Sequence, residues 1–377
     1  MTERPLAVVM IDSHAEIERG GAIQCVRLAV ALARRGHQVT CIFGRGGTAR
    51  NEGPYWEDLA EAGVRVERRA LSSLAAMRRF GAELAGLRPD IVHTHKNRAL
   101  YFLAGAVRGR REFGWVANRG TEYSLFRDPL AWAIHRFRVD RIIPVADAVK
   151  ERLIRDRIPA ERLPTIYGSF DADRFDPATS GAGMRAAWRI PAGAPLVGMA
   201  ASFNSRKKGH HDFLKAARGV LRNHEGAWFV LAGDGSPEFA KAFADELGIA
   251  DRVRFPGFVS DMPAALATMD VVVCASLQGE GLTGTVREAL AMARPVVSTD
   301  VAGNRELVRD GVTGLLTPAR DPPALASAIS QLLASPAEAG RLAAAGRALV
   351  LETCTDEVRA SKVEQVYQEL LAERAPA

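Results

Sequence analysis

Short apolar runs alternate along the chain with longer segments whose apolar residues recur at helical spacing. The first run covers residues 6–11 and ends at Asp12, and a polar loop with Gly20 and Gly21 leads into an amphipathic segment. Residues 39–44 form the next apolar run. Compact apolar runs favour buried parallel strands, and the amphipathic segment favours a helix. The chain therefore opens as strand, loop, helix and strand, which is typical of a doubly wound α/β fold.

The same alternation continues to the C-terminus. Further strands are expected at residues 64–70, 89–95, 114–120, 140–146, 195–203, 227–235, 253–258, 270–276, 295–300 and 313–318. Helices are expected at residues 22–38, 74–88, 97–110, 147–157, 209–224, 239–249 and 262–269, near 285, and after residue 318 to the end. The pattern predicts two similar α/β halves.

A break in this pattern separates the two halves. Residues 167–183 are rich in Gly, Asp, Ser and Pro and have no apolar period, as expected of a linker. We expect an N-terminal domain at 1–170, a linker at 171–183, a C-terminal domain at 184–355 and a last helix at 356–377 that packs back on the N-terminal domain. Two doubly wound domains joined in this way are expected to face a central cleft, with ligands at the carboxyl ends of the strands.

Composition narrows the class of protein. The 377 residues are 47% hydrophobic and 25% charged, as in ordinary globular proteins, and the net charge is +6. This balance favours anionic partners, namely nucleotide phosphates, an anionic membrane surface or nucleic acid, without choosing among them. Arginines of the first half are consistent with peripheral binding to an anionic leaflet and equally with a solvated face: Arg78, Arg79, Arg108, Arg110 and Arg111.

Cysteine spacing and apolar run lengths address compartment and metal. The four cysteines form no CxxC pair, and no histidine cluster completes a metal site, so we expect no metal and a reducing compartment. No window contains eighteen consecutive apolar residues, and the N-terminal apolar stretch is too short for a signal peptide. We expect a cytoplasmic protein, with peripheral membrane contact left open.

The most informative chemistry lies in the loop at residues 279–285. Gly281 and Gly284 lack side chains, so a ligand can approach the backbone N–H groups just before the following helix, an arrangement suited to phosphate. Glu280 and Glu288 flank this loop, and carboxylates accept hydrogen bonds from paired hydroxyls. The combination predicts a nucleotide sugar. The alternative is a helix capped by Thr283 or Thr285 with surface carboxylates.

Two other loops in the second half strengthen the nucleotide-sugar hypothesis. Arg206, Lys207 and Lys208 lie between a strand and a helix, where a lysine reaches a diphosphate. Gly233 and Gly235 follow another strand and fit a tight turn near a base or ribose. The third glycine of a dinucleotide fingerprint is absent, which argues against a dinucleotide oxidoreductase.

Polar residues at strand ends in the first half are candidates for the acceptor side. Asp12 ends the first strand, and His93 and His95 share one face at the end of another. Histidines with a purely structural role are the alternative.

These motifs together resemble the family 4 retaining glycosyltransferases of GT-B fold, also called glycosyltransferases group 1. The most specific part is the E-x7-E motif inside "SLQGEGLTGTVREALAMARPVVSTD". Supporting parts are "GGAIQCVRLAVALARRGHQV", "RPDIVHTH", "ASFNSRKKGHHDFLKA" and "RVRFPGFVSDMPAAL", so the resemblance covers nearly the whole chain.

The resemblance implies residue roles. Glu280 would bind the donor sugar, Glu288 the ribose, and Lys208 the diphosphate, with Glu280 and Lys208 as the catalytic pair. The remaining donor contacts would come from Gly20, Gly21, Arg206, Gly233, Phe258, Val259, Gly281, Leu282, Thr283 and Gly284.

The sequence departs from the family pattern at several positions. Ser202 stands where the family has an arginine, and Arg206 or Lys207 is the candidate replacement. Arg119 stands near the position of a usual histidine and is an acceptor-side candidate. Arg294 replaces a glycine, and Gly168-Ser169 replaces Asn-Gly in the linker.

The resemblance also implies the reaction. A sugar would pass from a nucleotide-diphosphate donor to a carbohydrate or lipid-linked acceptor with retention of configuration, without cofactor or metal, in cell-surface polysaccharide or lipopolysaccharide synthesis. The alternatives are a GT-B sugar-nucleotide epimerase and a non-catalytic sugar-nucleotide binding protein. Neither the base and sugar of the donor nor the acceptor can be read from the sequence.

Overall fold

The computed structural model describes residues 4–15, 17, 20–45, 54–107, 109 and 111–375. The chain divides into two compact units. Unit 1 comprises residues 1–169 and 356–377, and unit 2 comprises residues 170–355. Each unit is described by itself below. Arg108 and Arg110 lie outside the described residues.

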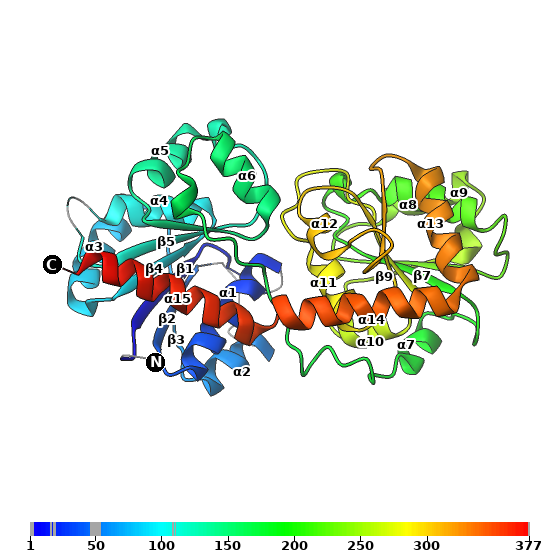
Figure 1. Cartoon of the computed structure of the whole chain (residues 1–377), viewed down its shortest axis with the longest axis horizontal. Coiled ribbons are helices and arrows are strands. Elements are labelled where there is room, and N and C mark those ends of the chain that lie inside the picture. The colour runs from blue at the N-terminus through cyan, green and yellow to red at the C-terminus, as the bar shows by residue number, and fades with distance from the viewer. Residues whose placement is uncertain are drawn as a thin grey trace. The chain divides into compact units, whose positions relative to one another are not determined.

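Unit 1 contains a six-stranded parallel sheet in the order β3-β2-β1-β4-β5-β6 (Figure 1). Every expected strand of the first half is present, and the ends differ from the expected ones by a few residues. The strands are β1 Ala7–Asp12, β2 Gln38–Gly44, β3 Arg65–Arg69, β4 Ile91–His95, β5 Gly114–Arg119 and β6 Arg141–Pro144.

Helices cover both faces of this sheet. Residues of α1, α2 and α15 share one apolar cluster with inward-facing strand residues, while α3, α4 and α5 contact one another on the other face (Figure 1). The helices are α1 Gly20–Arg34, α2 Pro54–Glu61, α3 Leu74–Leu87, α4 Lys96–Ala106, α5 Pro129–Phe137, α6 Asp147–Arg155 and α15 Asp356–Arg374.

The last helix, α15, completes the core of unit 1. Val363, Tyr367 and Leu370 are buried in the same cluster as the apolar residues of α1. Polar contacts fix it as well: the Arg359 guanidinium donates to the Gln24 carbonyl at 2.6 Å, and the Arg35 Nε donates to Glu364 at 2.7 Å. These contacts explain why a helix that follows unit 2 in the sequence belongs to unit 1.

Unit 2 repeats the topology of unit 1 with a second six-stranded parallel sheet, in the order β12-β11-β10-β7-β8-β9. Its strands are β7 Leu196–Ala200, β8 Trp228–Ala232, β9 Val253–Gly257, β10 Val271–Cys274, β11 Val296–Thr299 and β12 Leu315–Thr317. Its helices are α7 Ala182–Ala187, α8 His210–Val220, α9 Glu238–Glu246, α10 Met262–Ala267, α11 Gly284–Ala291, α12 Asn304–Leu307, α13 Pro322–Ala334 and α14 Pro336–Thr353.

The segment expected to link the two domains is grouped with unit 2. Phe170 and Phe175 are buried with their rings 6.4 Å apart, and α7 occupies the end of the segment. The Phe170 N–H donates to the Cys354 carbonyl at 2.9 Å. The polar composition of residues 167–183 concealed these two aromatic anchors.

The two sheets explain where functional side chains gather. In each sheet the strand order reverses between two neighbouring parallel strands, β1 and β4 in unit 1 and β7 and β10 in unit 2. Loops diverge at the carboxyl ends of such strands and leave a crevice that binds ligands. The residues that follow these four strands are therefore the first to consider.

Among the described residues, we find no helix with the length and apolar content needed to cross a membrane.

Candidate functional site

In unit 2, a lysine and a glutamate meet at the point where the strand order reverses. Lys208 lies in the loop after β7, and Glu280 lies in the loop after β10. The Lys208 Nζ is 2.7 Å from the Glu280 Oε1, and both side chains are partly exposed. Gly209 lets this loop pass close to its neighbour, because a Cβ there would lie 1.9 Å from the Ala275 carbonyl oxygen. The two residues predicted to act together are thus within hydrogen-bonding distance.

A network of short contacts holds Glu280 in place. The Ser276 hydroxyl donates to the same Glu280 Oε1 at 3.0 Å. The Thr299 hydroxyl donates to the Ser276 carbonyl at 2.6 Å, which joins the loop to β11. The Leu277 N–H donates to the Lys207 carbonyl at 2.7 Å, which joins the two loops directly. The carboxylate is therefore positioned before any ligand arrives.

The first turn of α11 carries backbone donors beside this pair. Thr283 occupies the N-cap position, but its side chain makes no capping hydrogen bond, and the Thr285 hydroxyl donates to the Ala200 carbonyl at 2.9 Å. The alternative of a capped helix would require one of these two threonine side chains to cap α11, and neither does. Unpaired N–H groups at a helix N-terminus favour an anion.

The space above this turn is open toward Glu288. A Cβ placed on Gly284 would be 3.9 Å from the Glu288 Oε1 and 3.7 Å from an Arg287 nitrogen, which are ordinary contacts. The packing of unit 2 therefore does not require glycine at 284. The Gly281 carbonyl accepts from the Gly303 N–H at 2.9 Å, and Leu282 is half-buried.

Gly233, in contrast, is required by the backbone. A Cβ there would lie 2.0 Å from the Ala201 carbonyl oxygen, because the loops after β7 and β8 pass each other at that point. Gly235 has a φ of +91°, and a Cβ would lie 2.6 Å from the Asn204 side chain. Packing is thus a sufficient reason for both glycines, whether or not a base or ribose lies nearby.

The other donor candidates lie around the same loops. The Arg206 guanidinium is 5.5 Å from the centre of the Phe239 ring, a cation–π distance. The Ser202 hydroxyl accepts from the Asn204 N–H at 3.3 Å. Phe258, just after β9, is 62% exposed, and Val259 is half-buried. An aromatic side chain this exposed is available for stacking.

In unit 1, Asp12 and His14 form a pair at the carboxyl end of β1. Asp12 is fully buried, and its Oδ1 accepts from the His14 backbone N–H at 2.8 Å and lies 2.6 Å from the His14 Nδ1. His14 itself is partly exposed. A carboxylate that holds one ring nitrogen fixes the orientation of the other. The acceptor-side candidate Asp12 is thus placed to orient His14 and has no exposed surface of its own.

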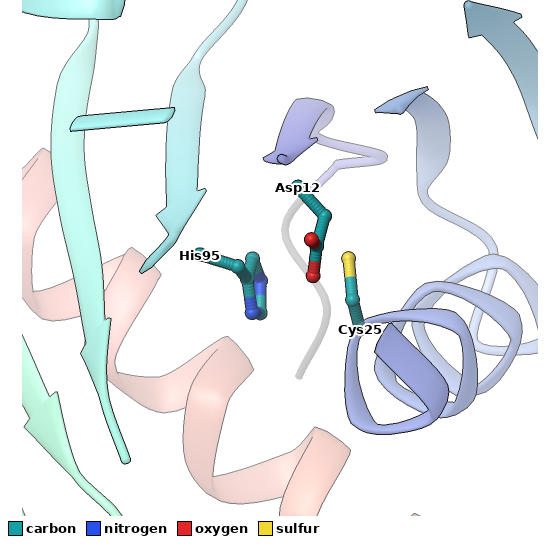
Figure 2. A group of neighbouring side chains, drawn as sticks. All are labelled: Asp12, Cys25 and His95. Carbon is teal, nitrogen blue, oxygen red and sulfur yellow. The ribbon is translucent and has the colours of Figure 1, made fainter. Parts of the chain in front are cut away.

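Beneath this pair lies a buried polar cluster. Figure 2 shows Asp12, Cys25 and His95 converging from the end of β1, from α1 and from the end of β4. Their potential ligand atoms lie within 4.8 Å of one another, a spacing that a metal ion would accept. Burial is the main cause that lowers the pKa of His95, and the positive charge of the nearby Arg359 guanidinium lowers it further and opposes a cation at this place. We therefore interpret Cys25 and His95 as residues that hold the Asp12 side chain in position.

The two strand-end histidines of β4 are buried and neutral. His93 is 2.7 Å from the Tyr367 hydroxyl through its Nδ1, and its ring stacks on His95 with centres 4.5 Å apart. Burial lowers the pKa of His93 to about 3 and holds the pKa of His95 well below its ordinary value. Both rings face the core between the sheet, α1 and α15.

Buried neutral histidines make unit 1 sensitive to acid. The pKa of His93 falls from about 6.5 in the unfolded chain to about 3 in the folded one, so its contribution to stability is complete above pH 6.5 and is lost as the pH falls toward 3. Each pH unit in that window costs about 1.4 kcal/mol for one such group. We expect His93→Gln to be less stable at pH 7.5 but to lose stability less steeply between pH 6.5 and 4, measured by urea unfolding. Equal slopes in the two proteins would contradict this reading.

Gly20 and Gly21 form the first turn of α1. A Cβ on Gly20 would have no described neighbour within 4 Å, whereas one on Gly21 would lie 3.0 Å from the Lys96 Cε and 3.2 Å from a His14 ring carbon. Lys96 begins α4 with a φ of +72°, a left-handed conformation that is energetically unfavourable for a lysine. The glycine pair, His14 and Lys96 thus share the edge where β1 and β4 end.

Arg119, the remaining acceptor-side candidate, ends β5. Its guanidinium donates to the Tyr123 carbonyl at 2.6 Å, and burial lowers its pKa. It is half-buried in unit 1.

Sequence reasoning missed several residues that shape these two edges. Ser276, Asn304, His14 and Lys96 were not candidates, because each acts through a partner distant in sequence or through a backbone conformation. The Asn304 side chain, for example, accepts from the Thr283 N–H at 3.4 Å and donates to the Ser298 hydroxyl at 3.0 Å. For His14 and Lys96 the available signal was their position immediately after a strand end.

Curated relatives match this chain along part of its length. The lipopolysaccharide core biosynthesis glycosyltransferase LpsE of Rhizobium meliloti is 34% identical over 191 residues, which cover 50% of this chain and 53% of that protein. The chain spans about half the length of the first three curated relatives that it matches.

Solved structures match the fold over nearly the whole chain. A glycosyltransferase from Rickettsia africae superposes with a TM-score of 0.83 at 19% identity, covering 98% of this chain and 99% of that one. Anabaena Alr3699/HepE, solved in complex with UDP-glucose, superposes with a TM-score of 0.81 at 20% identity, covering 97% of this chain and 100% of that one. At these identities the likeness concerns the fold.

Two family models match, one in each half of the chain. The model described as Glycosyltransferase Family 4 matches residues 19–174, and the model described as Glycosyl transferases group 1 matches residues 194–335. The first match includes the Gly20-Gly21 turn and the second includes Lys208, Glu280 and Glu288. Together they cover most of the chain, and this chain belongs to the group 1, family 4 glycosyltransferases.

Proposed function

We propose that the protein is a retaining glycosyltransferase that takes its sugar from a nucleotide-diphosphate donor bound in unit 2. The observation that carries this proposal is the 2.7 Å contact between Lys208 and Glu280 beside the uncapped first turn of α11. A diphosphate needs cationic and N–H donors, and sugar hydroxyls need a carboxylate acceptor. The carboxyl ends of β7 and β10 offer all three kinds of group.

The proposed reaction follows from this placement. The bond between the anomeric carbon and the diphosphate oxygen breaks, and its electron pair remains on the diphosphate. The Lys208 ammonium and the N–H groups of residues 281–284 would stabilise that growing charge. The acceptor oxygen attacks the same face of the sugar, and its proton passes to the departing diphosphate. Since these protein groups can meet the charge of the leaving group, we propose a mechanism that requires no metal and no cofactor.

The proposal also includes the acceptor, the pathway and the place of the reaction. The named relative acts in lipopolysaccharide core biosynthesis, and the HepE structure contains UDP-glucose. We therefore propose a carbohydrate or lipid-linked acceptor in polysaccharide or lipopolysaccharide synthesis, at the cytoplasmic face of the membrane. His14 of unit 1 is a proposed acceptor-side group, with Asp12 and the buried histidines beneath it, while Gly20 and Gly21 remain predicted donor contacts.

Donor binding provides the direct test. We expect one class of UDP-, GDP- or ADP-sugar to raise the melting temperature, because a ligand at a hundred times its Kd contributes about 2.7 kcal/mol. For a unit of this size that corresponds to a rise of roughly 5–10 °C. A thermal-shift panel with the matching free sugars as controls measures this. If no nucleotide diphosphate stabilises the protein, the assignment of the site is wrong.

A further inference from the structure

Large apolar side chains are exposed in one region of unit 1. Phe126, Leu130 and Phe137 are 50%, 61% and 69% exposed and all lie in residues 126–137. Ile154, on the neighbouring helix α6, is also exposed. These four make up more than half of the exposed large apolar side chains among the described residues. Contiguous exposed apolar surface of this kind marks a binding site more often than isolated residues do.

The three side chains lie on two consecutive helical segments. Phe126 lies in the short helical turn Leu125–Arg127, and Leu130 and Phe137 lie seven residues apart on one face of α5. The Trp132 ring is 6.0 Å from the Phe126 ring and 5.8 Å from the Phe137 ring, so the aromatic surface is continuous. We call Phe126, Leu130, Trp132 and Phe137 the aromatic ridge.

The ridge is held rigidly at the surface. The Trp132 Nε1 donates to the Asp156 carbonyl at 2.8 Å, which ties the ridge to the end of α6. The Asp128 carboxylate caps α5 by accepting from the Ala131 N–H at 3.1 Å. The Arg162 guanidinium donates to the His135 and Arg136 carbonyls at the other end of the helix. The backbone and side chains of the ridge are therefore already ordered before a partner binds.

Positive charge borders the ridge. The Arg127 guanidinium lies 5.4 Å from the Tyr123 ring, and the Arg136 guanidinium lies 5.3 Å from the Phe137 ring. Arg157, next to the Asp156 carbonyl that holds Trp132, is exposed. The acidic Asp128 is engaged with the helix N-terminus and the Tyr101 hydroxyl. Arginines stacked on exposed aromatic rings favour a partner that is apolar at depth and anionic at its surface.

We propose that the aromatic ridge inserts shallowly into an anionic lipid bilayer and holds the protein at the membrane surface. An interfacial helix buries its apolar face at the boundary between headgroups and acyl chains, and basic residues at its border meet anionic headgroups. The ridge has both components. The inference rests on the proposed function for its biological meaning, because it names the surface that would bring the enzyme to a membrane-bound acceptor.

Two of the arginines that the sequence suggested for membrane contact are engaged with carboxylates. Arg111 forms an ion pair with Asp140 at 2.6 Å, and Arg79 forms one with Glu83 at 2.9 Å. Both charges are therefore partly neutralised within unit 1.

Vesicle flotation tests the proposal with the full-length protein. We expect it to float with vesicles of equal parts phosphatidylethanolamine and phosphatidylglycerol, and to float much less with phosphatidylcholine alone. The double variant Leu130→Ser, Phe137→Ser should lower the partition coefficient at least about tenfold, because two large side chains no longer enter the bilayer. The matched control is Leu74→Ser, Val312→Ser, which removes two apolar residues elsewhere that are 53% and 50% exposed and should float like the wild type.

The charges are tested in the same assay. Arg127→Gln, Arg136→Gln should weaken binding to the anionic vesicles several-fold, while Arg218→Gln, Arg222→Gln on the surface of unit 2 should not. The proposal is overturned if the wild type stays unbound, if the ridge variant floats equally well, or if sedimentation shows a dimer that the ridge variant dissociates. The donor thermal-shift assay on the ridge variant should be unchanged, so a failure here is separable from a failure of the proposed function.

Discussion

Lys208→Met should lower sugar transfer by about a hundred- to a thousand-fold, the usual cost of removing one group that stabilises developing negative charge. Methionine keeps the length of the side chain but loses the ammonium group that lies 2.7 Å from Glu280. The fold should survive, because partly exposed ion pairs contribute little to stability and Glu280 keeps its bond from Ser276. Initial rates with the donor identified by thermal shift measure the effect.

The control for this variant is Lys241→Met, which removes an exposed lysine of α9 that pairs with Glu238. It should transfer sugar at the wild-type rate. Glu280→Ala should also lose transfer, and because the two residues contact each other, the double variant should lose less than the sum of the two effects. Full activity in Glu280→Ala would exclude the proposed role of the pair.

A further experiment separates a transferase from the two alternative functions. A sugar-nucleotide binding protein would bind donor without measurable transfer in the wild type. An epimerase would convert the donor sugar in the absence of any acceptor. Product analysis of the wild type with and without acceptor distinguishes these from a transferase.

Gly233→Ala and Gly284→Ala should have opposite consequences although both glycines follow strands of the same sheet in unit 2. At 233 a Cβ would lie 2.0 Å from a backbone oxygen, so alanine forces the loops after β7 and β8 apart and should destabilise unit 2 by about 3 kcal/mol or more. At 284 a Cβ meets ordinary contacts of 3.7 and 3.9 Å, and stability should change by less than about 1 kcal/mol.

For donor binding, by contrast, Gly284→Ala should be the variant with the larger effect. The methyl group at 284 would stand over the first turn of α11 and keep a phosphate away from the N–H groups, which should weaken donor binding at least about tenfold, or 1.4 kcal/mol. Urea unfolding gives the stability of each variant, and titration calorimetry gives the donor affinity. A stable Gly284→Ala protein with wild-type affinity would show that the phosphate does not lie at this turn.

Much of the fold was predictable because its strands are buried on both faces. All the expected strands are present, because short continuous apolar runs such as those of β7 and β10 are stable in few conformations other than a buried strand. The helices α2, α5, α7 and α12 were not predicted. Helix α5 carries exposed Leu130 and Phe137 on one face and buried Ala131 and Ile134 on the other, so its apolar residues show no clear period.

The candidate site could be proposed from the sequence where its residues lie in one short segment. Glu280, Gly284 and Glu288 share a loop and a helix, and together with the basic loop at Lys208 they suggested a phosphate turn between two carboxylates, which stays a prediction. The partners that position them could not be read from spacing, because Ser276, Thr299 and Asn304 reach the loop from different strands and helices. Asp12 was recognised as a strand-end carboxylate, but its burial under His14 depends on contacts across the sheet.

Helix α15 also has a consequence for biosynthesis. Unit 2 is one uninterrupted stretch of chain, whereas unit 1 needs residues from both ends of the polypeptide. A ribosome that has released residue 355 has completed every contact of unit 2, while the first sheet still lacks the helix that covers Tyr367 and Leu370. The half that emerges first is therefore the last to be finished, and until then its uncovered apolar face is a natural substrate for chaperones.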